Sequence, residues 1–220
     1  LSLWENLPLV VLAGVVFCLL CAPAVLLLYL APLVPAVLVA VLTVPPAWAA
    51  LLALEARIAE DRKANLGTML AAWPRLWTRS VGLGLLAAFP FLVGLLTLPL
   101  LSAPQVPTVV WVGLAADAFG LLLLAALYVY AFPLLALHDL GVGVALRNAL
   151  ILSSRHILNT LGLLAMAVLF GFGVAYISPG LLVILPPIWG LFIINNCRMV
   201  VAEELERSGA SSPTAGDDRR

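Results

Sequence analysis

The chain consists of long apolar stretches that are interrupted by short polar segments. The 49 residues between Glu5 and Glu55 carry no charge, and further uncharged runs extend over residues 80–116 and 157–197. A transmembrane helix needs about 20 predominantly apolar residues, so each run is long enough to cross a bilayer at least once. The pattern predicts an all-α, polytopic membrane protein.

Prolines and turn-forming residues divide these runs. One helix over residues 6–54 would be about 73 Å long, whereas the hydrocarbon core is about 30 Å thick. Pro32 and Pro35 predict a turn in the first run, and residues 102–107 and 178–180 predict turns in the other two. The predicted spans are 7–30, 33–57, 80–101, 108–137, 156–177 and 181–201. They form one transmembrane domain over residues 1–207, and the polar tail over 208–220 is expected to be disordered.

The basic residues orient the six spans. All eleven Lys and Arg residues then lie on one side of the membrane, either in the two longer loops or at and beyond the end of the last span. These residues are Arg57, Arg62, Lys63, Arg75, Arg79, Arg147, Arg155, Arg198, Arg207, Arg219 and Arg220. The positive-inside rule makes this side cytoplasmic. We therefore expect a multi-pass protein of the bacterial inner membrane with both termini in the cytoplasm. Five or seven spans would place basic residues on both sides.

Composition narrows the function classes. Hydrophobic residues make up 64% of the chain and charged residues only 10%, whereas a soluble domain has roughly 25% charged residues. The eleven acidic residues balance the eleven basic ones, which argues against a nucleic-acid binder. The sequence has no phosphate-binding loop, no HExxH motif and no serine-nucleophile motif. We therefore expect no enzyme activity, no catalytic residues, no cofactor and no metal.

Two sets of similar segments suggest an internal repeat. Pro45-Pro46-Ala47-Trp48 recurs as Pro186-Pro187-Ile188-Trp189, and an arginine follows nine residues after each Trp. The two basic loops are also similar to each other at an offset of 76 residues, at which Arg79 matches Arg155. We predict three helical hairpins, each preceded by an interfacial helix, with Trp4–Asn6 as the remnant of the first one.

The first basic loop carries an amphipathic stripe. Leu66, Met69, Trp73 and Leu76 recur at helical spacing, and residue 79 on the opposite face is basic. An aromatic and basic helix of this kind suits the membrane interface. The sequence therefore predicts an interfacial helix over residues 66–79, separate from the span that begins at residue 80.

Segments along the chain resemble the YesL-like family of bacterial membrane proteins. Thr43–Leu51 (TVPPAWAAL) is similar to the family's Thr-aliphatic-Gly-Pro-Ala-Thr-Ala-Ala-Leu stretch. Leu70–Ser80 (LAAWPRLWTRS) is similar to its aromatic and basic segment before the next span. Tyr130–Asp139 (YAFPLLALHD) and Leu146–Leu150 (LRNAL) resemble its Phe-Pro-Leu-Leu segment and the Lys-Asn-Ala helix after it. The likeness covers nearly the whole chain up to about residue 201.

This resemblance implies an accessory function. The family has no established biochemical activity, but its members are often associated with carbohydrate ABC importers. The chain departs from the family in its longer apolar stretch before Thr43 and in Pro46-Ala47-Trp48, where Pro-Ala-Thr is usual. These departures affect the boundary between the first two spans.

Asp117 is the main candidate for a functional site within the membrane. It is the only charged residue predicted well inside a span, about 15 Å from the turn at Pro107. A charge at the bilayer centre costs about 2.5–3.5 kcal/mol on insertion scales. Asp117 could therefore serve a proton- or substrate-coupled site. The structural alternative is a protonated or hydrogen-bonded Asp117 that holds its helix to a neighbour through groups such as Thr97 or Tyr128.

Other polar residues are weaker candidates. Asn195 and Asn196 lie near the inner end of the last span, where side-chain amides bond across membrane helices. Cys18 and Cys21 have CxxC spacing but stand among apolar residues without further ligands, so we interpret them as packing residues. The two histidines flank the second basic loop, where helix capping or headgroup contact is expected. The prolines of the second, fourth and last spans can either kink these helices or free carbonyls for a binding site.

The expected function is that of a non-enzymatic accessory or assembly partner of a transport complex, acting by helix–helix contact. Expected partners are the lipid bilayer and ABC importer subunits or other membrane proteins, with a homo-oligomer as a further option, and no nucleic acid. The competing function is a small transporter or a lipid- or small-molecule-binding protein that uses Asp117 and the proline-broken helices. A polar cavity at Asp117 would favour the second function, and a dry packed core the first.

Overall fold

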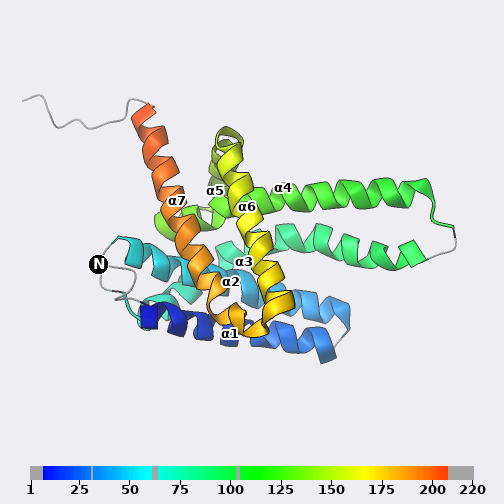
Figure 1. Ribbon diagram of the computed structural model, residues 1–220, viewed down its shortest axis with the longest axis horizontal. Coiled ribbons are helices and arrows are strands. Elements are labelled where there is room, and N and C mark those ends of the chain that lie inside the picture. Colours follow the sequence, from blue (N-terminus) through cyan, green and yellow to red (C-terminus); the bar gives the residue numbers. More distant parts are fainter. Residues whose placement is uncertain (1–6, 31, 61–63, 103–104, 208–220) are drawn as a thin grey trace, which may run out of the picture.

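The computed structural model describes residues 7–30, 32–60, 64–102 and 105–207 (Figure 1). These residues form helices and no β-strand, which confirms the all-α class for this part of the chain. The α-helices are α1 (Leu7–Leu30), α2 (Leu33–Ala59), α3 (Leu66–Thr97), α4 (Thr108–His138), α5 (Val142–Arg155), α6 (Ile157–Phe172) and α7 (Leu185–Arg207). Three short turns of 3₁₀ or π-helix are η1 (Leu98–Ser102), η2 (Gly173–Ile177) and η3 (Pro179–Val183). The tail over 208–220 and the segment Trp4–Asn6 lie outside the described residues.

Six helical segments of the described chain are long and apolar enough to cross a membrane. They are Leu7–Leu30, Leu33–Ala59, Leu66–Ser102, Thr108–His138, Ile157–Ile177 and Leu185–Arg207. Their number agrees with the six predicted spans. The grouping into three hairpins with interfacial helices stays a prediction.

The third span differs from its prediction. The sequence predicts a break before Ser80, whereas α3 continues from Leu66 to Thr97 without interruption. Asn65 caps its first turn by accepting a hydrogen bond from the Thr68 amide at 3.0 Å. Ser80 fits inside the helix because its hydroxyl donates to the Leu76 carbonyl at 2.8 Å. At 1.5 Å per residue α3 is about 48 Å long, which is more than the thickness of the hydrocarbon core.

The last span also begins later than predicted. Residues 179–183 form a 3₁₀ turn, and α7 begins at Leu185 instead of residue 181. Pro186 and Pro187 therefore lie in the first turn of α7, where backbone amides have no intrahelical acceptor and a proline does no harm. These two prolines start a helix, and they do not kink it as the sequence suggested.

The core is centred on α2. The second half of α2, from about Pro46 to Ala56, is buried against α1, α3, α4 and α7, and alanines occupy many of the contact positions. Ala47, Ala49 and Ala50 are completely buried. Small side chains allow helix backbones to approach closely, which is how transmembrane helices pack without a hydrophobic driving force between them.

Two prolines in the middle of α2 free a carbonyl that a neighbouring helix satisfies. Pro46 has no N–H to donate to the Leu42 carbonyl four residues earlier. The Trp77 indole of α3 donates to this carbonyl at 3.2 Å. Gly84 of α3 allows the approach, because a Cβ there would lie 2.6 Å from the Pro45 ring. The proline pair is thus built into the α2–α3 contact.

One part of the fold extends away from this core. The outer parts of α3 and α4 run side by side beyond the other helices (Figure 1). No described residue of α3 after Gly84 is buried, and none of α4 before Val129. We call the described residues within 85–102 and 105–128 the outer arm.

Candidate functional site

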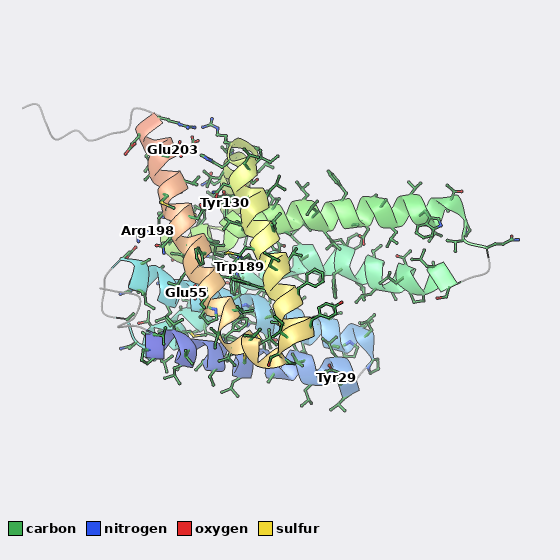
Figure 2. All side chains as sticks on the ribbon, in the orientation of Figure 1. Tyr29, Glu55, Tyr130, Trp189, Arg198 and Glu203 are labelled. Atoms are coloured by element: carbon green, nitrogen blue, oxygen red, sulfur yellow. The ribbon has the colours of Figure 1, made fainter. Side chains whose placement is uncertain are left out.

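A buried carboxyl group lies where α2 and α7 cross (Figure 2). Glu55 of α2 is 1% exposed, and neither of its carboxyl oxygens has a hydrogen-bond partner among the described residues. It faces the backbone of Gly190 in α7, where an added Cβ would lie 2.0 Å from Oε2. Buried charges in proteins are normally paired, so this group needs an explanation beyond packing.

Two tryptophans of the same helices stack on each other. Trp48 lies two turns before Glu55 in α2, and Trp189 directly precedes Gly190 in α7. The rings of Trp48 and Trp189 have centroids 5.3 Å apart and an interplanar angle of 26°. Phe17 of α1 meets Trp48 edge-on at 6.1 Å. Trp48 and Trp189 are the matching residues of the repeated Pro-Pro-x-Trp motif. The structure therefore brings the two copies of this motif into contact.

The repeat also relates the polar residues of the crossing. The offset of 141 residues between Trp48 and Trp189 relates Glu55 to Asn196. In each helix the polar residue follows its tryptophan by seven positions, which returns to nearly the same helix face. Trp189 Nε1 and Asn196 Nδ2 are, like the Glu55 oxygens, buried and without a hydrogen-bond partner in the described structure. We call Glu55, Trp189 and Asn196 the polar seam.

The polar seam continues into a hydrogen-bonded cluster between α4, α6 and α7. Asn159 of α6 donates to Asn196 Oδ1 at 2.8 Å and to the Tyr130 hydroxyl at 3.3 Å. Tyr130 is completely buried, and Thr160 lies next to it with its hydroxyl donating to the His156 carbonyl at 3.0 Å. Such bonds between membrane helices contribute about 0.6–2 kcal/mol each, so this cluster fixes α6 and α7 against α4.

Basic side chains connect the ends of neighbouring helices. Arg198 of α7 donates to the Ala59 carbonyl at the end of α2 at 2.5 Å. Arg79 of α3 donates to the carbonyl and to the carboxylate of Asp139 at 2.6 and 2.5 Å. Asp139 ends α4 in the left-handed conformation, with a φ of 53°. These contacts join segments that the positive-inside rule assigns to one side of the membrane.

A further ion pair joins the ends of α5 and α7. Arg155 pairs with Glu204, and the His156 ring lies 3.4 Å from the same carboxylate. His156 is thus a contact at the junction of α5 and α6. No group of three or more metal-ligating side chains is found among the described residues.

The structure places Asp117 apart from the polar seam. Asp117 lies half-buried in the outer arm, with its carboxylate against Gly94 of α3, where a Cβ would be 2.8 Å from Oδ2. The two partners that the sequence suggested each donate their hydroxyl to a backbone carbonyl instead of to Asp117. Thr97 bonds to the carbonyl of Val93 in its own helix, and Tyr128 bonds to that of Leu83 across the α3–α4 contact.

Of the other predicted residues, some make contacts within the fold and some are exposed. Asn195 is exposed, while its neighbour Asn196 belongs to the polar seam. Cys18 points its thiol at the Leu182 carbonyl at 3.4 Å, and Cys21 is also a free thiol. The sequence analysis missed Glu55 because this residue ends an uncharged run and so resembles the start of a polar loop. Its spacing of seven residues from Trp48, matched by Trp189 and Asn196, was the available signal.

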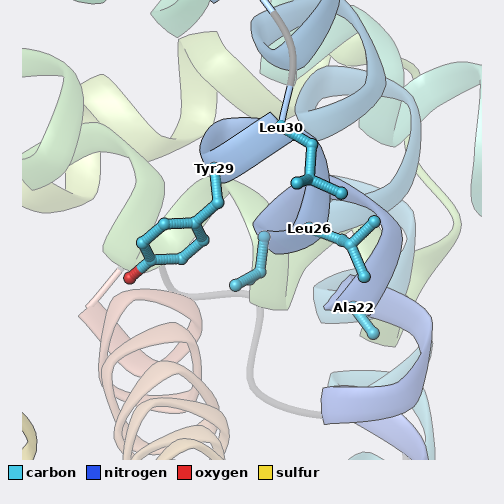
Figure 3. Close-up of a pocket in the computed structure, with 5 residues that line it drawn as sticks. Ala22, Leu26, Tyr29 and Leu30 are labelled. Atoms are coloured by element: carbon cyan, nitrogen blue, oxygen red, sulfur yellow. The ribbon is translucent and has the colours of Figure 1, made fainter.

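A shallow apolar hollow of about 450 Å³ lies at the end of α1 (Figure 3). All five lining residues belong to α1 itself: Ala22, Val25, Leu26, Tyr29 and Leu30. It is therefore a feature of a single helix surface, and no polar side chain other than Tyr29 contributes to it.

Comparisons with protein-family models, with curated proteins and with solved structures find no match.

Proposed function

We propose that the protein is a non-enzymatic membrane subunit that acts by helix–helix contact, as an accessory or assembly partner of a transport complex. The observation that best supports this proposal is the outer arm. Its α4 part, residues 108–128, would extend about 31 Å as a helix, close to the hydrocarbon thickness. Most of this length projects beyond the other helices (Figure 1), so most of its surface is free for lipid or a partner.

Asp117 favours a protein partner over lipid alone. Its carboxylate lies among apolar residues and has no hydrogen bond in the described structure, although a charge in this position is costly in lipid. Gly113 and Gly120 stand about one turn on either side of it, and a Cβ at either position would meet nothing within 4 Å. Small residues next to a polar group are typical of transmembrane interfaces. The expected partner is a membrane helix that carries a hydrogen-bond donor for Asp117.

The proposal includes the cellular setting. The basic residues, which would all lie on one side of a six-span protein, favour cytoplasmic termini, and the resemblance to the YesL-like family favours the bacterial inner membrane. The resemblance to the YesL-like family favours an ABC importer subunit as the partner, and a second copy of this chain is the alternative partner.

Photocrosslinking in native membranes tests the contact. A photoreactive residue at Phe119, which is 68% exposed in the outer arm, should form an adduct with one membrane protein that mass spectrometry identifies. The same residue at Leu158 of α6, which is 84% exposed outside the outer arm, serves as the control. Adducts with lipid alone, or the same protein adduct from both positions, would contradict the proposal.

Two substitutions of Asp117 distinguish the partner function from the transporter function. Asp117→Asn keeps a hydrogen-bonding side chain and should retain the Phe119 adduct, whereas Asp117→Leu should lose it. Under the competing transporter function, Asp117→Asn would fold normally but lose proton-coupled uptake or ligand binding, because only an ionisable group couples to protons. Observing that loss with unchanged stability would overturn the partner function.

A further inference from the structure

We propose that Glu55 is a proton-binding site that holds α7 against α2 in its neutral form and releases this contact when it ionises. The side chain is 1% exposed and lies against the Gly190 backbone, so the carboxyl group is shielded from bulk water. Both oxygens lack a partner in the described structure. Burying a carboxylate in this state costs several kcal/mol, and one bound proton removes that charge.

A metal cation would lack ligands at Glu55, since no group of three or more His, Cys, Asp or Glu side chains occurs among the described residues. Trp189 Nε1 and Asn196 Nδ2 carry hydrogens and have no acceptor in the described structure. N–H groups of this kind cannot ligate a cation, whereas a single proton on Glu55 needs no further ligand.

Titratable groups on the packed helices do not supply a counter-charge to Glu55. The helix α1 has no charged residue, and its titratable groups are two cysteines and a tyrosine. Arg79 of α3 is bonded to Asp139, and Tyr130 of α4 is bonded to Asn159. On α7, Cys197 is a buried free thiol, and Arg198 is bonded to the Ala59 carbonyl.

Arg198 is the group that can receive the charge after ionisation. Ala59 follows Glu55 by four residues, so both lie on the same face of α2 about 6 Å apart. When the O–H bond of the acid breaks, the proton passes to water at this end of α2 and leaves a carboxylate one turn from the guanidinium. A shift of Arg198 by one turn of α2 would pair the two charges. Ionisation thus exchanges the Gly190 contact for an Arg198 contact.

Infrared spectroscopy of the full chain in nanodiscs tests the protonation state. At neutral pH the wild-type protein should show the C=O stretching band of a protonated carboxyl group. The band should be lost in Glu55→Gln and retained in Asp117→Asn. Incorporation of ¹³C-glutamate should shift the band in the wild-type protein. This measurement does not depend on a substituted chain being able to fold. The proposal is overturned if the wild-type band is missing or is unmoved by the label, or if a band that the glutamate label shifts persists in Glu55→Gln.

The role of Arg198 is tested in the same spectra. Raising the pH should abolish the acid band, and in Arg198→Gln this loss should occur at higher pH because the carboxylate has lost its counter-charge. Arg207→Gln is the matched control, since Arg207 pairs with Glu203. In Arg207→Gln the acid band should disappear at the same pH as in the wild-type protein. An unchanged midpoint in Arg198→Gln, or the same shift in both variants, would overturn the exchange of contacts.

Discussion

Replacing Gly190 with alanine should destabilise the crossing of α2 and α7. The new Cβ would lie 2.0 Å from Glu55 Oε2, 2.7 Å from Cδ and 2.8 Å from Oε1. Atoms cannot approach so closely, so either the Glu55 side chain or α7 must move. Overpacking in a dense core costs typically about 1–3 kcal/mol. We expect the free energy of unfolding to fall by this amount.

The free energy of unfolding can be measured by denaturant titration of the purified protein in detergent. Gly113→Ala is the matched control, because Gly113 is also helical but a Cβ there would meet nothing within 4 Å. Alanine is favoured over glycine in a helix by about 0.5–1 kcal/mol. The control should therefore be neutral or slightly stabilising.

A double variant assigns the cost to Glu55 itself. In a Glu55→Ala background the carboxyl group is absent, so Gly190→Ala should add little further destabilisation. The two substitutions should then show a coupling energy of about 1–3 kcal/mol, within the range for residues in contact. An equal cost of Gly190→Ala in both backgrounds, or a cost no larger than that of Gly113→Ala, would refute the packing argument.

Two further predictions concern topology and the α2–α3 contact. A membrane-impermeant thiol reagent applied to intact cells should modify Gln105→Cys but not Asn65→Cys, and modification of both from outside would contradict six spans. Trp77→Phe should lower the free energy of unfolding by about 1–3 kcal/mol, because the Leu42 carbonyl loses its donor. In a Pro46→Ala chain the restored amide can donate to that carbonyl, so Trp77→Phe should cost clearly less there. Equal costs in both chains would show that the indole bond does not compensate for the proline.

The sequence alone was sufficient for the class and the number of long helices. Uncharged length and turn residues are local properties, and the apolar helices of the described chain follow from them. The bounds of α1 agree with the predicted span over residues 7–30. The break predicted before Ser80 was wrong, because a change from amphipathic to apolar pattern alters which environment a helix faces and does not require its backbone to end.

The tertiary structure decided which residues form a site. Asp117 stood out in the sequence because it interrupts an apolar run, yet it lies in the outer arm away from the core. Glu55 borders such a run and looked like a loop residue, but α7 covers it through a glycine that has no side chain to keep the two helices apart. Burial of a polar group depends on what another helix places over it. That information comes from residues more than a hundred positions away, so the burial of the polar seam is decided by the packed fold.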